Sequence, residues 1–174
     1  SGGIEGSTGE GTAGIVKGTA GVGEDVLRGG LQPCLGFVDL QVNGYLGTSF
    51  SSDTLTLESC VSTCEALLAR GGCACIVPTV ITAPVATLEH VLPILADACE
   101  CEQLRGRLLG IHLEGPFISA LKGAVGTHPA QCVLSPAASE GCAMLDRWQA
   151  LARGHIKLLT IAAEVDGAAA LCAH

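Results

Sequence analysis

Two short segments carry polar side chains whose types and spacing could do chemistry: DLQVNG, which starts at Asp39, and HLEGPF, which starts at His112. Each segment forms or ends an apolar run of strand length, which puts its polar residues at the end of a predicted strand. Alternate residues of a strand share a face, so Gln41 pairs with Asn43, and His112 with Glu114. A carboxylate buried at a strand end is costly unless a cation meets it, and a metal ion is the obvious candidate. The spacing predicts one polar cavity lined by these side chains.

A second interpretation of the same residues stays open at this point. Glu114 could pair with an arginine or cap a following helix, while Gln41, Asn43 and His112 satisfy backbone groups of nearby loops. Spacing alone does not decide between a metal ligand and a structural carboxylate.

The elements that must position these residues follow a β-α alternation from about residue 36. Strands are predicted at 36–43, 73–80, 107–114 and 155–162, and helices at 57–70, 85–103 and 144–152, followed by a short alanine-rich end. Gly71 and Gly72 mark the end of the first helix, and Pro93 must kink the second helix or lie in its first turn. Four such units predict an α/β fold that amounts to half of a (β/α)₈ barrel. A small open three-layer sheet is the alternative, although it would leave two apolar edges to protect.

Composition excludes several classes of protein. The chain has 174 residues, 48% of them hydrophobic, and a formal net charge of -8, which argues against a nucleic-acid partner because phosphate binding needs a clustered basic surface. No apolar stretch is long enough to span a bilayer, and the N-terminal residues lack the features of a secretory leader. We therefore expect a cytoplasmic protein with no membrane contact. Most of the ten cysteines are expected to be small core residues, with a zinc site at Cys73-x-Cys75 or Cys99-x-Cys101 as the less favoured interpretation.

The first thirty residues differ from the rest in being rich in glycine. Residues 1–30 are predicted to be a mobile segment, and residues 31–174 the partial barrel domain. The segment from Gly9 to Gly14 matches the dinucleotide pattern G-x-G-x-x-G, but no strand precedes it and no Gly-Lys-Ser/Thr follows it, so neither a dinucleotide site nor a P-loop is expected.

Four stretches in order resemble a known family: GFVDLQVNG, LLARGG with PTVIT after it, LLGIHLEGPF, and the segment from Lys122-Gly123 to His128-Pro129. They are similar to the N-terminal half of the N-acetylglucosamine-6-phosphate deacetylases, which belong to the amidohydrolase superfamily. The similarity covers residues 31–164 and leaves the glycine-rich start uncovered. It implies a metal-dependent hydrolase that converts N-acetylglucosamine 6-phosphate into glucosamine 6-phosphate and acetate.

The resemblance also implies roles for individual residues. Glu114 takes the place of a metal ligand, and Gln41 and Asn43 stand where other amidohydrolases have a His-x-His metal pair, so they surround the metal site. Because neutral amides are weak ligands, one divalent ion is expected, with zinc as the metal. Thr127 and His128 match a pair that binds substrate.

The expected chemistry is metal-assisted amide hydrolysis. The metal lowers the pKa of bound water and polarises the acetamide carbonyl, while an aspartate takes the proton and returns it to the leaving amine. By the resemblance, that aspartate and the remaining metal histidines lie beyond residue 174, so no catalytic residue is assigned. His155 opens the last strand at the opposite end from Glu114 and is expected in the core or on the surface, and His174 has little support as a ligand.

Two departures from the family's pattern concern loops. The segments Pro33 to Gly36 and Lys122 to His128 are each longer by two residues than the family's, and the second places the geometry of substrate binding in doubt. A truncated deacetylase is the favoured hypothesis. The alternatives are a catalytically inactive half-barrel that binds a sugar phosphate or assembles subunits, and a hydrolase of another acetylated sugar. The edges of a half-barrel need a partner, and a homodimer is the simplest.

Overall fold

The computed structural model describes residues 35–70, 72–135 and 137–174. The predicted mobile segment 1–30 therefore lies outside the described residues, as does Gly71. The part from Leu35 to His174 is one compact unit of alternating strands and helices. None of the helices formed by these residues has the length and hydrophobicity needed to cross a membrane.

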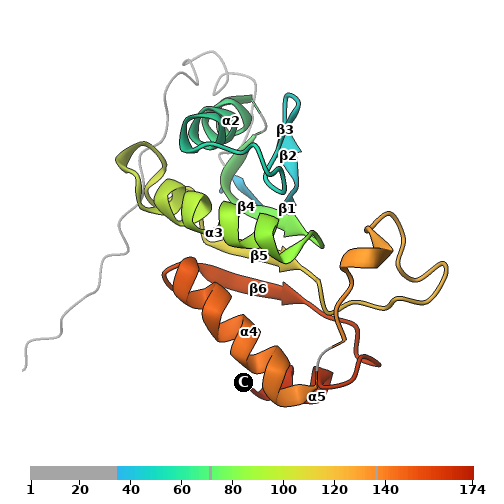
Figure 1. The fold of residues 1–174 in the computed structure, drawn as a ribbon. Helices are drawn as coiled ribbons and strands as arrows, with labels where there is room; N and C mark the ends of the chain where they lie inside the picture. The colour runs from blue at the N-terminus through green and yellow to red at the C-terminus, as the bar shows by residue number, and fades with distance from the viewer. Residues whose placement is uncertain (1–34, 71, 136) are drawn as a thin grey trace, which may run out of the picture. The chain divides into compact units, whose positions relative to one another are not determined.

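A four-stranded parallel sheet forms the centre of this unit (Figure 1). Its strands lie side by side in chain order: β1 (Phe37–Val42), β4 (Cys73–Ile81), β5 (Ile111–Glu114) and β6 (Ile156–Thr160). β4 and β5 lie inside the sheet, whereas β1 and β6 are its edges. Parallel strands in sequential order, each joined to the next through a helix, are the arrangement expected of consecutive βα units.

Three long helices connect the strands: α2 (Leu57–Arg70), α3 (Val85–Glu100) and α4 (Ala138–Leu151). α3 packs against both α2 and α4, and the short terminal helix α5 (Ala168–Ala173) packs against α4. Ile111 and Leu113 of β5 belong to the core that these helices share with the sheet. Because successive residues of a strand point to opposite faces, His112 and Glu114 face away from that core.

The helix predictions agree with the structure at most boundaries, and the differences have local causes. The first helix occupies 57–70 as predicted. The second begins at Val85, so Pro93 lies in its interior, neither in the first turn nor at an end. A 3-10 turn at Glu102–Leu104 takes the place of its predicted last residues. The third helix starts at Ala138 instead of residue 144, because Gly141 and the small residues around it hide its first turns in the sequence.

The predicted strand 107–114 is shorter in the structure, where β5 begins at Ile111. Gly110 interrupts it with a φ of +141°, which other residues rarely adopt. Leu108 makes a single bridge to Ile76, and Arg107 turns its guanidinium to the backbone carbonyls of Ala74 and Cys73. The last strand likewise occupies 156–160 within the predicted 155–162.

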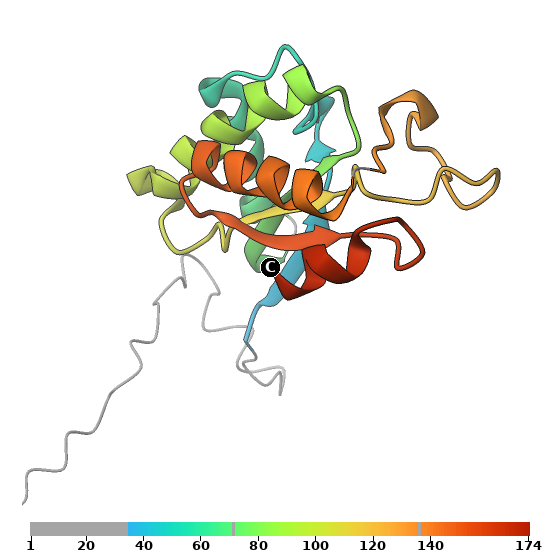
Figure 2. The same ribbon diagram turned by 60° about the horizontal axis from the view of Figure 1, so that its bottom comes forward.

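Two features have no counterpart in the predictions. A two-stranded antiparallel sheet pairs β2 (Gly44–Tyr45) with β3 (Thr48–Ser49), each too short to show a hydrophobic pattern. A long loop follows β5 and runs to α4, with one 3-10 turn at Ala130–Cys132. Figures 1 and 2 show this loop, in gold and orange, projecting beyond the arrowheads of β5 and β6.

The start of that loop is held to the core by an aromatic pair. Phe117 is fully buried, and its ring lies 5.7 Å from the ring of Trp148 on α4, tilted by 32°. The Phe117 carbonyl also accepts a hydrogen bond from Ala162 N at 2.9 Å. Phe117 therefore ties the segment after Glu114 to both α4 and the end of β6.

We expect Phe117→Ala to lower the free energy of unfolding by about 3–5 kcal/mol, because it removes a buried ring and leaves a cavity. Chemical denaturation followed by circular dichroism measures this loss. Leu121→Ala in the same loop is the control, since Leu121 is 68% exposed and should cost less than about 0.5 kcal/mol. Equal losses in the two variants would contradict an anchoring role for Phe117.

Candidate functional site

Glu114, the last residue of β5, is the centre of a small polar cluster. Its side chain is 20% exposed. Its Oε2 accepts a hydrogen bond from Gln41 Nε2 at 3.0 Å, and its Oε1 lies 3.6 Å from His128 Nε2. The structure thus brings together three of the five residues predicted to form the site.

The three side chains reach this point from different elements. Gln41 lies near the end of β1, Glu114 ends β5, and His128 belongs to the long loop after β5. Since the strands are parallel, the C-terminal ends of β1 and β5 lie at the same end of the sheet. The fold therefore joins residues 73 positions apart in the sequence.

The charge of Glu114 meets no permanent cation among the described residues. Neither a lysine nor an arginine of residues 35–70, 72–135 or 137–174 forms an ion pair with it, and His128 is charged only when protonated. The arginine partner of the second interpretation is thus not found in this part of the chain. His128 Nδ1 is a buried nitrogen without a hydrogen-bond partner there, a state that costs about 1–3 kcal/mol.

The backbone at Glu114 and Gly115 is held by hydrogen bonds to two threonines. Thr82 Oγ1 donates a hydrogen bond to the Glu114 carbonyl at 3.0 Å, and Gly115 N donates to the Thr160 carbonyl at 3.0 Å. Gly115 has a φ of +89°, and a Cβ at this position would lie 2.1 Å from Thr82 Oγ1. Only glycine fits here without moving the threonine that supports Glu114.

His112 is buried between two threonine hydroxyls and does not touch the cluster. Its Nδ1 lies 3.2 Å from Thr79 Oγ1, and its Nε2 lies 2.8 Å from Thr160 Oγ1. Burial lowers the pKa of His112 below its ordinary value, and the Glu114 carboxylate partly offsets that effect. The structure therefore agrees with the expectation that His112 shapes the strand end.

The other two predicted site residues lie outside the cluster. The Asn43 side chain is exposed. Its backbone carbonyl accepts a hydrogen bond from Phe50 N at 3.0 Å. Thr127 is also exposed, next to His128 in the loop. Neither side chain hydrogen bonds to another described residue. Their predicted roles as metal-site shell and substrate-binding residue remain predictions.

The remaining histidines that sequence analysis considered are engaged elsewhere. His155 Nε2 lies 3.0 Å from Glu100 Oε1, in a surface group that also joins Arg153 to Glu100. Hydrogen bonds from Arg153 and His155 hold the pKa of the Glu100 carboxyl below its ordinary value, and the bond from Arg153 has the larger effect. His174 Nε2 lies 2.7 Å from Asp146 Oδ1, which joins α5 to α4.

The described cysteines of helices α2, α3, α4 and α5 are free thiols. Cys60 and Cys64 of α2 and Cys99 of α3 are buried in the core. The pKa of Cys64 is raised by its hydrogen bond with Cys60 and, to a smaller extent, by burial. Burial raises the pKa of Cys99 to about 12. Within the described part of the chain, no group of three or more His, Cys, Asp or Glu side chains is placed to hold a metal ion. Cys60, Cys64 and Cys99 are thus buried as expected, whereas the other described cysteines are partly exposed or, in the case of Cys172, exposed.

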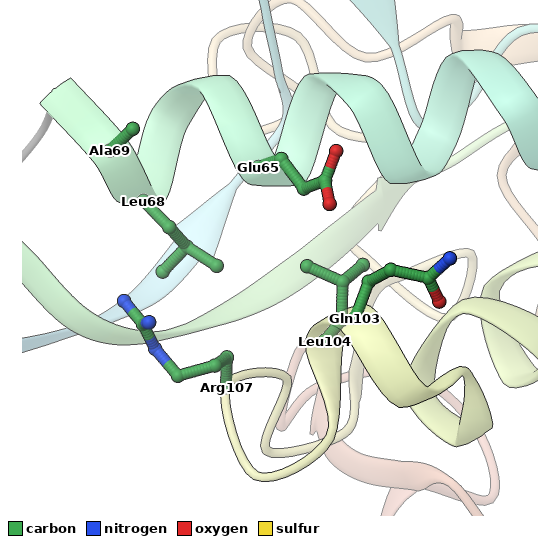
Figure 3. A pocket seen from close by; sticks show the side chains of 6 residues that line it. All are labelled: Glu65, Leu68, Ala69, Gln103, Leu104 and Arg107. Carbon is green, nitrogen blue, oxygen red and sulfur yellow. The ribbon is translucent and has the colours of Figure 1, made fainter. Parts of the chain in front are cut away.

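An open depression of about 220 Å³ lies at the other end of the sheet. Figure 3 shows the side chains that line it, from the C-terminal half of α2 and the segment before β5: Glu65, Leu68, Ala69, Gln103, Leu104 and Arg107. Because α2 leads into the start of β4, this depression is next to the N-terminal ends of the strands. It is smaller than the roughly 300–1,000 Å³ typical of ligand sites and is separate from Glu114.

Comparisons with known proteins point to one kind of enzyme. A 137-residue match with the N-acetylglucosamine-6-phosphate deacetylase of Caenorhabditis elegans is 36% identical and covers 76% of this chain and 32% of that protein. The crystal structure of N-acetyl-D-glucosamine-6-phosphate deacetylase from Mycobacterium smegmatis matches with a TM-score of 0.63 and 31% identity, over 80% of this chain and 36% of that one. An N-acetylgalactosamine-6-phosphate deacetylase of Shewanella sp. is 38% identical over 94 residues, which are 54% of this chain and 22% of that protein. No protein-family model matches. The chain spans about one third of the length of the first two relatives.

The support that Gly115 gives to Glu114 can be tested. We expect Gly115→Ala to cost about 1–3 kcal/mol of stability, because alanine would be strained at this φ and its Cβ would displace Thr82. Thermal unfolding measures the loss. Gly126→Ala is the matched control: Gly126 also has a positive φ, of +58°, but nothing lies within 4 Å of its Cβ position. A loss no larger than that of Gly126→Ala would argue against the contact with Thr82.

Proposed function

We propose that this chain, a homologue of N-acetylglucosamine-6-phosphate deacetylases that spans about one third of their length, provides the Glu114 side of a deacetylase active site. The observation that carries the proposal is the convergence of Gln41 and His128 on Glu114, at the strand ends where (β/α) barrels collect catalytic groups. The reaction is hydrolysis of the acetamide of an N-acetylated amino-sugar 6-phosphate, giving the amino-sugar phosphate and acetate.

The sugar in this proposal is N-acetylglucosamine 6-phosphate, because relatives that match about three quarters of this chain are named for it. The relative that is named for N-acetylgalactosamine 6-phosphate makes another acetylated sugar the second candidate. Thr127 and His128 are the proposed substrate contacts. The loop that holds them projects past the strand ends, where it can reach a molecule bound over Glu114 (Figure 2).

A divalent metal, with zinc as the expected ion, is part of this proposal. Glu114 offers a carboxylate that no described lysine or arginine neutralises. A catalytic zinc site needs three protein ligands, and the described residues do not complete such a set. The missing ligands and the catalytic aspartate are therefore assigned to groups outside the described residues.

That incomplete ligand set also favours a second candidate function. A half-barrel without the full set of ligands would bind a sugar phosphate, or assemble with another subunit, without turnover. The two functions differ in one measurable property, because only the deacetylase needs Glu114 to bind a metal. The cytoplasmic location expected from the sequence is compatible with both and stays a prediction.

In the second candidate function, the sheet is half of a (β/α)₈ barrel that a second copy of the chain completes. The edge strand β1 exposes Phe37, Val38 and Leu40, and the edge strand β6 exposes Leu158. Each copy has one edge of each kind, so a two-fold axis can pair β1 of one copy with β6 of the other twice. The result would be eight parallel strands, the number in a closed barrel of this type.

The metal proposal is tested by titrating the 174-residue chain with Zn²⁺ in a calorimeter. We expect Glu114→Gln to weaken binding by more than about tenfold, since even the loss of an outer-shell partner costs about that much. Glu89→Gln is the control, because Glu89 pairs with Arg147 on the surface. Unchanged zinc affinity in Glu114→Gln would contradict the proposal. Binding of N-acetylglucosamine 6-phosphate without any zinc binding would support the second function.

The assembly proposal is tested by sedimentation velocity at micromolar concentrations. We expect a dimer for the unsubstituted chain and a monomer for Leu40→Lys, because a charged side chain on an edge strand opposes pairing. Leu46→Lys is the control, since Leu46 is 69% exposed but lies between β2 and β3, away from the edges. A monomer in the unsubstituted chain would rule out closure by a second copy.

A further inference from the structure

A chain of hydrogen bonds crosses the whole sheet just before Glu114. It begins at Val42 N of β1, which donates to Thr79 Oγ1 of β4 at 3.1 Å. It continues from Thr79 to His112 of β5 and from His112 to Thr160 of β6. We call these four residues the polar chain. It links all four strands of the sheet through three side chains and the backbone N–H of Val42.

The polar chain replaces a backbone contact at its β1 end. The register between β1 and β4 is irregular between Asp39 and Val42. The Val42 N–H therefore finds a side-chain hydroxyl as its acceptor, where a regular ladder would offer a carbonyl. Gln41 lies directly before Val42, so the position of Gln41 depends on where the Thr79 hydroxyl is held.

His112 holds that hydroxyl and also reaches the opposite strand. Thr79 is fully buried, and its Oγ1 can donate either to the Val77 carbonyl at 3.3 Å or to His112 Nδ1. The second ring nitrogen of His112 contacts Thr160, which is paired with Glu114 in the β5–β6 register. In either tautomer, one ring nitrogen donates and the other accepts, so both hydroxyl contacts are satisfied by a neutral imidazole.

We propose that His112 is a positioning residue that sets the approach of Gln41 to Glu114. It acts on Gln41 through Thr79 and Val42, and on the Glu114 strand end through Thr160. The two ends of the polar chain therefore flank the 3.0 Å contact between Gln41 Nε2 and Glu114 Oε2. The importance of this contact for catalysis rests on the proposed function, whereas the contact itself can be measured without a metal or turnover.

A purely structural role for the polar chain would give a different result from a positioning role. If the chain only stabilised the fold, any substitution within it would lower stability and leave the Gln41–Glu114 contact intact in molecules that remain folded. If it positions Gln41, removing the Thr79 hydroxyl must move Gln41 even in a folded protein. A substitution that keeps the hydroxyl must leave Gln41 in place even where stability falls.

The test compares Thr79→Val with Thr79→Ser in the 174-residue chain. Valine has the shape of threonine without its hydroxyl, and serine keeps the hydroxyl but loses a methyl group from a fully buried position. The readout is the nuclear Overhauser contact between the Gln41 side-chain amide protons and the Glu114 γ-methylene protons. We expect this contact in the unsubstituted chain and in Thr79→Ser, and its loss in Thr79→Val. Thermal unfolding is expected to show that both variants are less stable than the unsubstituted chain.

Two further variants complete the design. His112→Leu should also abolish the contact, and if that variant fails to fold, the Thr79 pair still decides the question. His90→Leu is the control, because His90 lies on α3, outside the polar chain, and its Nε2 is 3.0 Å from the Leu55 carbonyl oxygen. Persistence of the contact in folded Thr79→Val, or its absence from the unsubstituted chain, would overturn the proposal. A chain that binds no zinc but shows the expected pattern would overturn only the metal proposal.

Discussion

The parallel alignment of β1, β4 and β5 is the constraint on which the site depends. Gln41 and Glu114 stand on strands that are not neighbours, because β4 lies between them. Adjacent strands are about 4.8 Å apart, so the two backbones are separated by roughly 10 Å. Only long side chains can bridge that distance. A glutamine and a glutamate meet across β4 at 3.0 Å, whereas the shorter asparagine and aspartate would fall short by about two carbon–carbon bonds.

The electrostatics of the site follow from what surrounds this bridge. Glu114 is four-fifths buried and faces a neutral amide and an imidazole. The described arginines that form ion pairs do so near the surface: Arg147 and Arg153 pair with acidic residues of α3, and Arg105 pairs with Glu102 three residues before it. These arginines are therefore engaged in structural contacts, and none of the described arginines or lysines pairs with the carboxylate at the strand end. This distribution separates the stabilising charges from the group proposed to bind a cation.

Much of this arrangement could be predicted from the sequence, because it depends on patterns that are local. The helix at 57–70 and the strand from Cys73 follow from apolar spacing, and the polar residues at the strand ends follow from alternation along DLQVNG and HLEGPF. The irregular register between Asp39 and Val42 could not be predicted. Strict alternation places Gln41 and Asn43 on one face, but β1 ends at Val42, and of these two side chains only that of Gln41 hydrogen bonds to Glu114.

Other features depended on tertiary contacts. Thr160 lies in none of the quoted motifs, and Thr79 lies in the PTVIT stretch but had no predicted role; only the alignment of four strands gives the two threonines a common partner in His112. The signal that could have identified them is a hydroxyl residue near the end of each neighbouring strand. The position of His128 beside Glu114 depends on a loop of more than twenty residues, and no periodicity in the sequence determines its path. The proposed half-barrel likewise depends on what pairs with the edge strands β1 and β6. The hydrophobic pattern within a single strand does not indicate that partner.

The buried thiols between α2 and α3 give the molecule a built-in reporter of its own motions. Alkylating reagents attack the thiolate, and both burial and the raised pKa values of Cys64 and Cys99 suppress that form in the folded state. Cys172, by contrast, is exposed on α5. Labelling of Cys172 therefore follows the chemistry of the reagent, while labelling of the two buried thiols waits for the helices to separate. The ratio of the two rates gives the free energy of local opening of this helix pair.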